Sequence, residues 1–171
     1  MRDDSVELVL KDEAATLTLG RILAQCLPPK GDIPPVLLRA PLGSGKTTLV
    51  RGFVSGLPGA EHAEVSSPSF NLANIYPTTP RVVHVDLYRL GEGVSAVNLE
   101  ELLEAGFGGE AGTIVVEWAE YLPVEALPPE RITICLGVSP TGRTAEMAAR
   151  GPRAEAWLEK TVNVYSQGFA S

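Results

Sequence analysis

Nine residues, A-P-L-G-S-G-K-T-T at positions 40–48, limit the folds open to this chain more than any other segment. A short apolar run, V-L-L-R-A at 36–40, leads into them, and a stretch with helical spacing of apolar residues, 46–57, follows. A buried strand, a glycine-bearing turn and a helix in this order are the setting in which backbone N–H groups and a helix N-terminus surround phosphate groups. The segment therefore predicts a phosphate-binding loop.

Ala40 and Pro41 depart from the usual pattern, which opens with Gly. A residue before proline is restricted to extended conformations, so we expect Ala40 to finish its strand with a negative φ. Pro41 lacks only an N–H group that the phosphates would not use. We expect the amides of Gly43 to Thr48 to wrap the phosphates, the Lys46 ammonium to lie between the β and γ groups, and the Thr47 hydroxyl to reach Mg²⁺.

Composition excludes several classes of function. The formal net charge is −7, and the four lysines are scattered, so the chain offers no basic stripe for direct binding of nucleic acid. The N-terminal segment is too acidic for a targeting peptide, and no apolar run approaches the length of a membrane helix. We expect a cytoplasmic protein with one domain over residues 1–171.

Strand and helix patterns alternate along the chain. The strands are expected at 5–10, 36–40, 66–76, 81–88, 113–118 and 131–138, and the helices after Asp12 and at 46–57, 97–107 and 152–165. The segment 141–151 has helix-forming residues, but its Thr-Gly turn suits a hairpin onto the same sheet. These elements predict a three-layer α/β fold with a mixed, mostly parallel sheet, a C-terminal antiparallel hairpin, and a helix and tail at 152–171.

Two carboxylates are expected near the loop. Asp86 ends the strand R-V-V-H-V-D, and Glu117 ends the strand T-I-V-V-E. Ligands of open α/β sheets bind at the carboxyl ends of strands, so three strand ends, those before the loop, at Asp86 and at Glu117, are predicted to converge. Either carboxylate can hold Mg²⁺, and Glu117 can instead orient an attacking water. His84 is expected to be a buried or supporting residue. Trp118 is expected to pack in the core, although an aromatic residue beside a nucleotide pocket can also contact a base or a partner.

The motifs A-P-L-G-S-G-K-T-T, S-S-P-S-F, H-V-D-L-Y-R-L and V-V-E-W, in this order and spacing, resemble those of the TsaE (YjeE) family of small bacterial ATPases. The resemblance implies a P-loop NTPase-like fold that binds ATP and Mg²⁺. It also implies a complex with the TsaB and TsaD subunits, which carry the transfer chemistry of threonylcarbamoyladenosine formation in tRNA. In that complex the chain would hydrolyse ATP slowly and meet tRNA only indirectly.

The same resemblance implies roles for individual residues. Glu13 matches a position that meets the base or sugar, although a first-turn Glu is also favoured by the helix dipole. Arg143 matches a position near the nucleotide, although a surface residue on a hairpin fits equally well, and Glu120 is carried over in the same way. Ser69 stands where a hydroxyl senses the γ-phosphate. The predicted nucleotide-binding residues are Glu13, Leu42, Gly43, Ser44, Gly45, Lys46, Thr47, Thr48, Glu120 and Arg143. The predicted catalytic residues are Lys46, Asp86 and Glu117, and the predicted metal ligands are Thr47, Asp86 and Glu117.

Two other functions use the same loop. A small-molecule kinase needs several arginines that converge on the transferred phosphate, and the sequence has no clustered pair beyond the loop. A nucleotide-gated binding module with negligible turnover would keep every binding residue. A GTPase is disfavoured, since the chain has no Asn-Lys-x-Asp segment.

Overall fold

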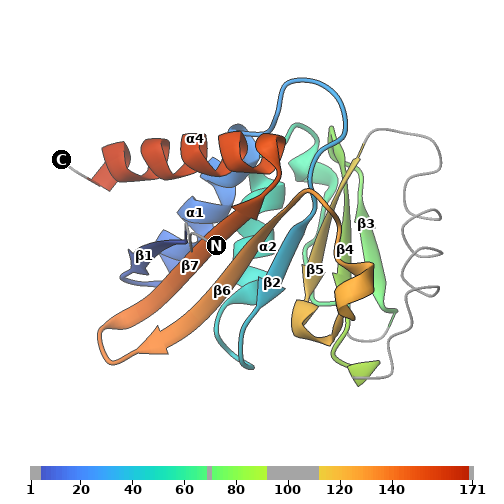
Figure 1. The fold of residues 1–171 in the computed structure, drawn as a ribbon, viewed down its shortest axis with the longest axis horizontal. Coiled ribbons are helices and arrows are strands. Elements are labelled where there is room, and N and C mark those ends of the chain that lie inside the picture. The colour runs from blue at the N-terminus through green and yellow to red at the C-terminus, as the bar shows by residue number, and fades with distance from the viewer. Residues whose placement is uncertain (1–4, 69–70, 92–111, 170–171) are drawn as a thin grey trace.

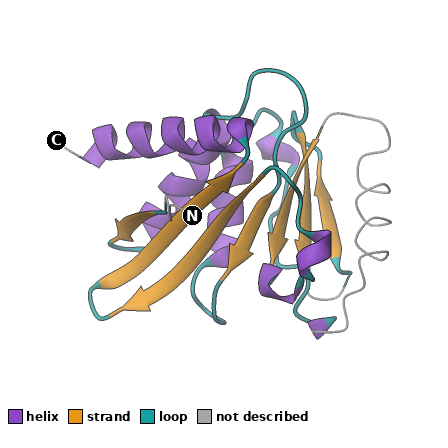
Figure 2. Cartoon of the chain, viewed as in Figure 1, coloured by secondary structure: helices purple, strands orange, loops and turns teal. Residues whose placement is uncertain are grey.

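The computed structural model describes residues 5–68, 71–91 and 112–169, and its elements follow the predicted alternation of strands and helices (Figures 1 and 2). The α-helices and strands are β1 (Val6–Leu10), α1 (Glu13–Gln25), β2 (Val36–Arg39), α2 (Lys46–Ser55), β3 (Ala73–Tyr76), β4 (Arg81–Asp86), β5 (Gly112–Glu117), β6 (Arg131–Ser139), β7 (Gly142–Arg150) and α4 (Pro152–Phe169). Short 3-10 helices lie at η1 (Ala60–His62), η3 (Ala119–Tyr121) and η4 (Val124–Ala126).

The strands form one mixed sheet in the order β1-β7-β6-β2-β5-β4-β3. The four central strands β6, β2, β5 and β4 run parallel, which brings their carboxyl ends to the same edge. Antiparallel partners flank them, with β3 beside β4 and with β7 and β1 beyond β6. Strands β6 and β7 are the predicted C-terminal hairpin, so the segment 141–151 is strand and its helical composition is overridden by pairing within the sheet.

Two predicted boundaries were wrong by four residues or more, and one predicted element lies outside the described residues. The expected strand at 66–76 is reduced to β3, because the Asn71 amide donates to the Pro68 carbonyl oxygen and Leu72 has a positive φ of 63°. The C-terminal helix continues past residue 165 to Phe169. The helix expected at 97–107 lies outside the described residues. No helix in the described part of the chain combines the length and the hydrophobicity needed to cross a membrane.

Alternate residues of β2 serve two hydrophobic clusters on opposite faces of the sheet. Val36 and Leu38 belong to the larger cluster, which also contains residues of α1, α2 and α4, the three helices on one face in Figure 1. Leu37 belongs to a smaller cluster on the other face, where Ala119 of η3 and the following Leu122 pack. A strand buried on both faces is the arrangement expected for a central parallel strand, so the predicted α/β fold is confirmed.

Helices α1 and α2 pack at very close range through glycines. A Cβ atom at Gly20 would lie 2.3 Å from the Leu49 carbonyl oxygen, and one at Gly52 would lie 2.2 Å from the Leu17 carbonyl oxygen. Only residues without a side chain allow this approach. Asp12 fixes the start of α1, since its Oδ1 accepts a 2.8 Å hydrogen bond from the Ala15 amide. The first turn of α1 is thereby held beside the loop that begins α2.

Candidate functional site

Three strand ends meet at one edge of the sheet, as the sequence predicted. Glu117, the last residue of β5, pairs in register with Leu38 of β2 on one side and with Asp86 of β4 on the other. The chain after β2 turns directly into the 40–48 loop, which leads into α2. The loop and both carboxylates are therefore brought together by the parallel register of three neighbouring strands.

The loop has the backbone conformation that its glycines allow. Gly43 has a φ of 76°, and Gly45, the N-cap of α2, has a φ of 102°, a region that other residues rarely adopt. The Ser44 hydroxyl donates to the Pro41 carbonyl oxygen at 2.7 Å and closes the turn. Leu72 and Trp118 are the non-glycine residues with positive φ in the described chain, so the prediction that Ala40 has a negative φ is confirmed.

Lys46 folds back onto its own loop. Its Nζ donates to the carbonyl oxygens of Ala40 at 2.7 Å and Pro41 at 2.9 Å, and it lies 4.0 Å from the centre of the Trp118 ring. Burial lowers the pKa of Lys46 from its ordinary value, and the nearby charge of Glu117 opposes that shift. The two residues that depart from the usual loop pattern thus supply the carbonyl groups that hold the lysine.

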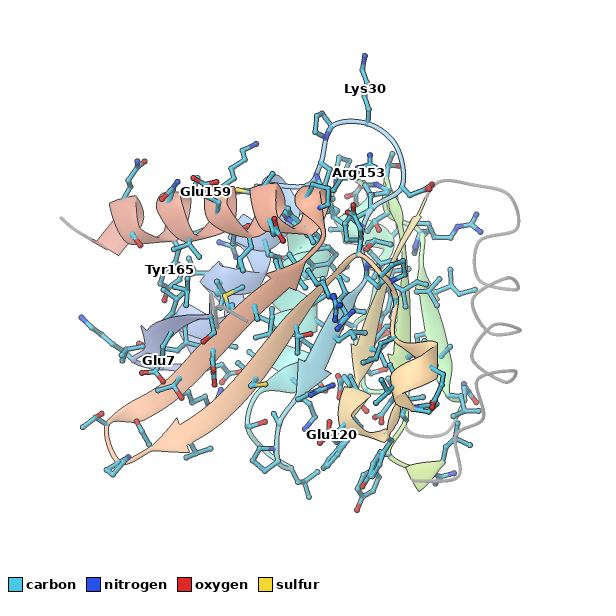
Figure 3. All side chains as sticks on the ribbon, viewed as in Figure 1. Glu7, Lys30, Glu120, Arg153, Glu159 and Tyr165 are labelled. Carbon is cyan, nitrogen blue, oxygen red and sulfur yellow. The ribbon has the colours of Figure 1, made fainter. Side chains whose placement is uncertain are left out.

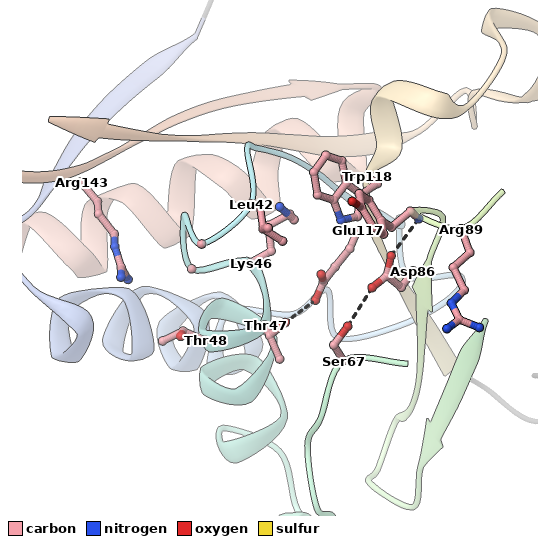
Figure 4. Close-up of a pocket in the computed structure, with 13 residues that line it drawn as sticks. Leu42, Lys46, Thr47, Thr48, Ser67, Asp86, Arg89, Glu117, Trp118 and Arg143 are labelled. Atoms are coloured by element: carbon pink, nitrogen blue, oxygen red, sulfur yellow. Dashed lines mark hydrogen bonds between the residues drawn. The ribbon is translucent and has the colours of Figure 1, made fainter. Parts of the chain in front are cut away.

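Each carboxylate has two hydrogen-bond donors, and Figure 4 shows those from Thr47 to Glu117 and from Ser67 to Asp86. Glu117 Oε1 accepts from the Thr47 hydroxyl at 3.0 Å and lies 2.8 Å from His84 Nε2. Asp86 Oδ2 accepts from the Ser67 hydroxyl at 2.8 Å, and Asp86 Oδ1 accepts from the Tyr88 backbone amide at 2.9 Å. His84 is fully buried, which agrees with the expectation of a buried or supporting residue.

A cavity of about 530 Å³ opens at this edge, a size common for small-molecule sites. Its lining comprises Leu42, Gly43, Gly45, Lys46, Thr47, Thr48, Ser67, Asp86, Tyr88, Arg89, Glu117, Trp118 and Arg143. The structure thus brings most of the predicted site residues into one cavity. Which of them bind nucleotide or metal stays a prediction.

Three predicted site residues do not line this cavity. Ser44 is fully buried, and its hydroxyl is engaged within the loop. Glu120 is exposed on η3 (Figure 3), but its charge still reaches Lys46 and, after that of Glu117, opposes the lowering of the lysine's pKa by burial. Glu13 is exposed one turn before Thr16, whose methyl group lies beside Gly45. Glu13 is therefore near the loop without contributing to the cavity wall.

Arg143, on β7, enters the site from the other side of the loop. A Cβ atom on Gly45 would lie 2.7 Å from the Arg143 Nη1 atom, which places the guanidinium against the loop. Nη1 is buried and has no hydrogen-bond partner among the residues that the structure describes. Buried donors normally have partners. Arg143 is thus a half-buried cavity residue rather than a hairpin surface residue, and it carries a buried donor beside the loop that no described residue satisfies.

Trp118 packs against the smaller hydrophobic cluster, as expected, but it is half-buried and also lines the cavity. A left-handed φ of 58° turns the chain directly after Glu117. Its ring centre lies 4.8 Å from that of Tyr88 and 6.0 Å from that of Tyr121. A bulky residue in this conformation is unusual and is found most often at functional sites. No local pattern in the sequence indicates a positive φ at this position.

Ser67, Tyr88 and Arg89 are cavity residues to which sequence reasoning gave no binding role. Tyr88 and Arg89 closely follow Asp86, and residues after a strand end at a ligand-binding edge are candidates on position alone. The sequence showed no clustered arginines, yet Arg89 and Arg143 line the same cavity, at its opposite ends in Figure 4. Strands β4 and β7 lie far apart in the chain, so only the fold reveals this pair.

Known proteins resemble the chain in both sequence and fold. A family profile described as "Threonylcarbamoyl adenosine biosynthesis protein TsaE" matches residues 10–145. Two relatives are described as "tRNA threonylcarbamoyladenosine biosynthesis protein TsaE". The one from a Nostoc species is 38% identical over 149 residues, covering 85% of this chain and 86% of the relative. The one from Streptomyces coelicolor is 42% identical over 119 residues, covering 68% and 74%.

A solved structure shares the fold. The structure described as "Crystal structure of Bacillus subtilus YdiB" superimposes with a TM-score of 0.70 at 26% sequence identity. The match covers 94% of this chain and 96% of that chain. The likeness therefore extends over nearly the whole chain.

Proposed function

Because the chain belongs to the TsaE family of tRNA threonylcarbamoyladenosine biosynthesis proteins, we propose that it binds ATP with Mg²⁺ and hydrolyses it slowly in support of this tRNA modification. The observation that carries the proposal is the meeting of Thr47, Asp86 and Glu117 in one cavity, beside a loop whose backbone amides begin a helix. Such a helix start attracts phosphate groups through its free N–H groups and its dipole.

The donor set of the cavity fits Mg²⁺. Magnesium prefers oxygen ligands and is commonly bound by one or two carboxylates, a hydroxyl and substrate phosphates. Thr47 and Asp86 would hold the ion, with Glu117 either as a further ligand or as the group that orients water. When bound, Mg²⁺ would neutralise negative charge on the phosphates.

The cationic groups of the cavity fit a triphosphate. The unpartnered Nη1 of Arg143 supplies a donor beside the loop. Lys46 is held by two carbonyl oxygens, and phosphate oxygens would compete with these for its three donors. Because burial lowers the lysine's pKa, an incoming anion would also favour its charged form.

Hydrolysis would transfer the γ-phosphoryl group to water. The water oxygen attacks the γ-phosphorus, and the bond to the β,γ-bridging oxygen breaks, with its electron pair leaving on ADP. Glu117 would orient the water and take its proton, while Lys46 and Arg143 would stabilise charge that builds on the phosphate oxygens. Turnover by this chain alone would be weak.

The partners would be the TsaD and TsaB subunits. A chain with a net charge of −7 is poorly suited to hold a polyanion, so contact with tRNA would come from these partners. The present chain would support the assembly through its nucleotide and would not transfer the carbamoyl group itself.

The test is reconstitution with purified TsaB, TsaD, substrate tRNA, a preformed activated threonylcarbamoyl donor and Mg²⁺. We expect complex formation and tRNA modification to depend on ATP, and Glu117→Ala to slow phosphate release by roughly 100-fold or more while nucleotide still binds. If the modification proceeds equally well without nucleotide, the proposal is wrong. If Glu117→Ala hydrolyses ATP as fast as the wild type, Glu117 has no catalytic role, and a nucleotide-gated binding module fits better.

The pair of arginines in the cavity gives the kinase alternative one supporting observation. The two functions differ in where the phosphoryl group goes. An ATPase releases inorganic phosphate in the absence of any acceptor, whereas a kinase needs a small-molecule acceptor and incorporates the label from γ-³²P-ATP into it. Phosphate release measured with the purified chain and no acceptor separates the two.

A further inference from the structure

A line of hydrogen-bonding groups runs across three adjacent strands into the site. The Tyr76 hydroxyl on β3 lies 3.1 Å from His84 Nδ1 on β4, and His84 Nε2 lies 2.8 Å from Glu117 Oε1 on β5. These three side chains are 3%, 0% and 2% exposed, respectively. Each contact joins diagonal neighbours on the same face of the sheet, since His84 is in register with Asn74 and Val115. The contacts are therefore fixed by the strand register.

The positions of the protons along this line follow from the acceptors. An ionised carboxylate only accepts hydrogen bonds, so His84 Nε2 carries the proton that is shared with Glu117. In the neutral ring Nδ1 then accepts, and the Tyr76 hydroxyl is the donor that faces it. The same hydroxyl lies 3.1 Å from the Ser66 carbonyl oxygen, which also accepts from Asn74 Nδ2 at 3.1 Å and has a lone pair for each donor. The tyrosine therefore contacts the histidine and the Ser66 carbonyl group at once.

We propose that His84, oriented by Tyr76, is a positioning residue that sets the carboxylate of Glu117 for hydrolysis. Thr47 and His84 both engage the same oxygen, Oε1, which fixes the plane of the carboxylate and leaves Oε2 for a water or a cation. Thr47 is also a predicted metal ligand, so its hydroxyl would be drawn away from Glu117 when Mg²⁺ binds. His84 is not a predicted metal ligand, so it would hold Glu117 both with and without bound Mg²⁺.

The backbone around Glu117 does not by itself fix this orientation. Strand β5 ends at Glu117, and Trp118 leaves the strand with a φ of 58°. A side chain at such a turn needs a partner to hold one rotamer, and small misplacements of catalytic groups cost large factors in rate. The inference rests on the proposed ATPase activity, and it concerns the rate of hydrolysis rather than the affinity for nucleotide.

The kinetic test compares His84→Leu, His84→Gln and Tyr76→Phe. We expect His84→Leu to lower kcat for ATP hydrolysis by roughly 10- to 100-fold, because Glu117 loses its orientation. KM, and the Kd for a non-hydrolysable ATP analogue, should stay within about twofold, because neither side chain lines the cavity. His84→Gln keeps an N–H donor for Glu117 and should recover most of kcat, and Tyr76→Phe should fall between the two.

Tyr165→Phe is the matched control for Tyr76→Phe. Tyr165 is equally buried, at 5% exposure, but it lies on α4, away from the strands that build the site. Both variants lose one buried hydroxyl, so we expect a similar loss of stability in the two. Only Tyr76→Phe should also lower kcat. Three results would each overturn the proposal. The first is an unchanged kcat in His84→Leu, and the second is a kcat in His84→Gln as low as in His84→Leu. The third is a loss of activity that comes from a higher KM or a lower melting temperature and not from a lower kcat.

A second measurement needs no activity and covers the case in which His84→Leu does not fold. The chain has two histidines, and His62 is exposed, so the imidazole ¹⁵N signals of His84 are readily assigned by NMR. We expect the free protein to show protonated Nε2, with Nδ1 as the nitrogen whose shift changes in Tyr76→Phe. Unprotonated Nε2 would refute the inference whether or not the protein hydrolyses ATP, whereas an inactive wild type with protonated Nε2 would count against the proposed function alone.

Discussion

Asp86 and Glu117 occupy paired positions at the carboxyl ends of the parallel strands β4 and β5. Two carboxylates this close repel each other unless donors or a cation compensate their charge. Each has two donors: Ser67 and the Tyr88 amide for Asp86, and Thr47 and His84 for Glu117. The arrangement places two carboxylate groups side by side at the sheet edge, where they would suit the proposed Mg²⁺.

The first prediction concerns Asp86→Asn. Asparagine has the same shape and can still accept from Ser67 or from the Tyr88 amide, so the fold should be unchanged. Loss of the charge should lower the Mg²⁺-dependent gain in ATP affinity by roughly 10- to 100-fold, the range seen when the surroundings of a metal site are altered. Titration calorimetry with ATP, in Mg²⁺ and in EDTA, measures the gain. An equal gain in wild type and variant would show that Asp86 does not act on the metal.

The second prediction concerns Arg143→Met. Methionine keeps much of the packing of the arginine stem but removes a buried donor that lacks a partner in the described structure, so the protein without ligand should be equally or slightly more stable. The rise in melting temperature on addition of ATP should shrink, since each tenfold loss of affinity removes about 1.4 kcal/mol of ligand stabilisation. Arg150→Met, at the exposed far end of β7, is the control and should keep the full rise.

The third prediction compares alanine at two helical glycines. Gly52→Ala places a methyl group 2.2 Å from the Leu17 carbonyl oxygen, so α1 and α2 must separate, at a cost of roughly 1–3 kcal/mol in the free energy of unfolding. Gly168→Ala in α4 meets no atom within 4 Å in the described structure and should gain up to about 1 kcal/mol of helix propensity. Urea denaturation of both variants should therefore give changes of opposite sign. A stabilising Gly52→Ala would contradict the close packing of the two helices.

The fourth prediction concerns α4, which follows the segment matched by the family profile. Trp157 is buried, its Nε1 donates to the Leu23 carbonyl oxygen at 2.9 Å, and its ring lies 6.5 Å from that of Phe53. Trp157→Ala should cost about 3–5 kcal/mol of unfolding free energy, the range for a large aromatic side chain in a core. Trp157→Phe, which loses mainly the hydrogen bond, should cost clearly less. A loss below about 1 kcal/mol for the alanine variant would mean that α4 is not part of the core.

The sequence by itself determined the order of the elements and the main chemical groups of the site. Positions 36–57 specify a strand, a glycine turn and a helix through local spacing, and Ala40 follows from the proline after it. Asp86 and Glu117 could be placed because a parallel sheet brings strand ends to one edge. Such inferences need only periodicity and local backbone preferences, which depend on residues close together in the chain.

The tertiary structure alone decided which distant side chains meet. Arg143 reaches the loop because β7 pairs with β6, and His84 reaches Glu117 because β4 and β5 align in one register. Trp118 lines the cavity as well as packing on the smaller cluster, and its positive φ is a backbone angle that no local motif specifies. Glu13, Ser44 and Glu120 could be named from a motif but not placed on the cavity wall. Contacts of this kind depend on strand pairing and packing between segments far apart in the chain, so a local sequence pattern cannot predict them.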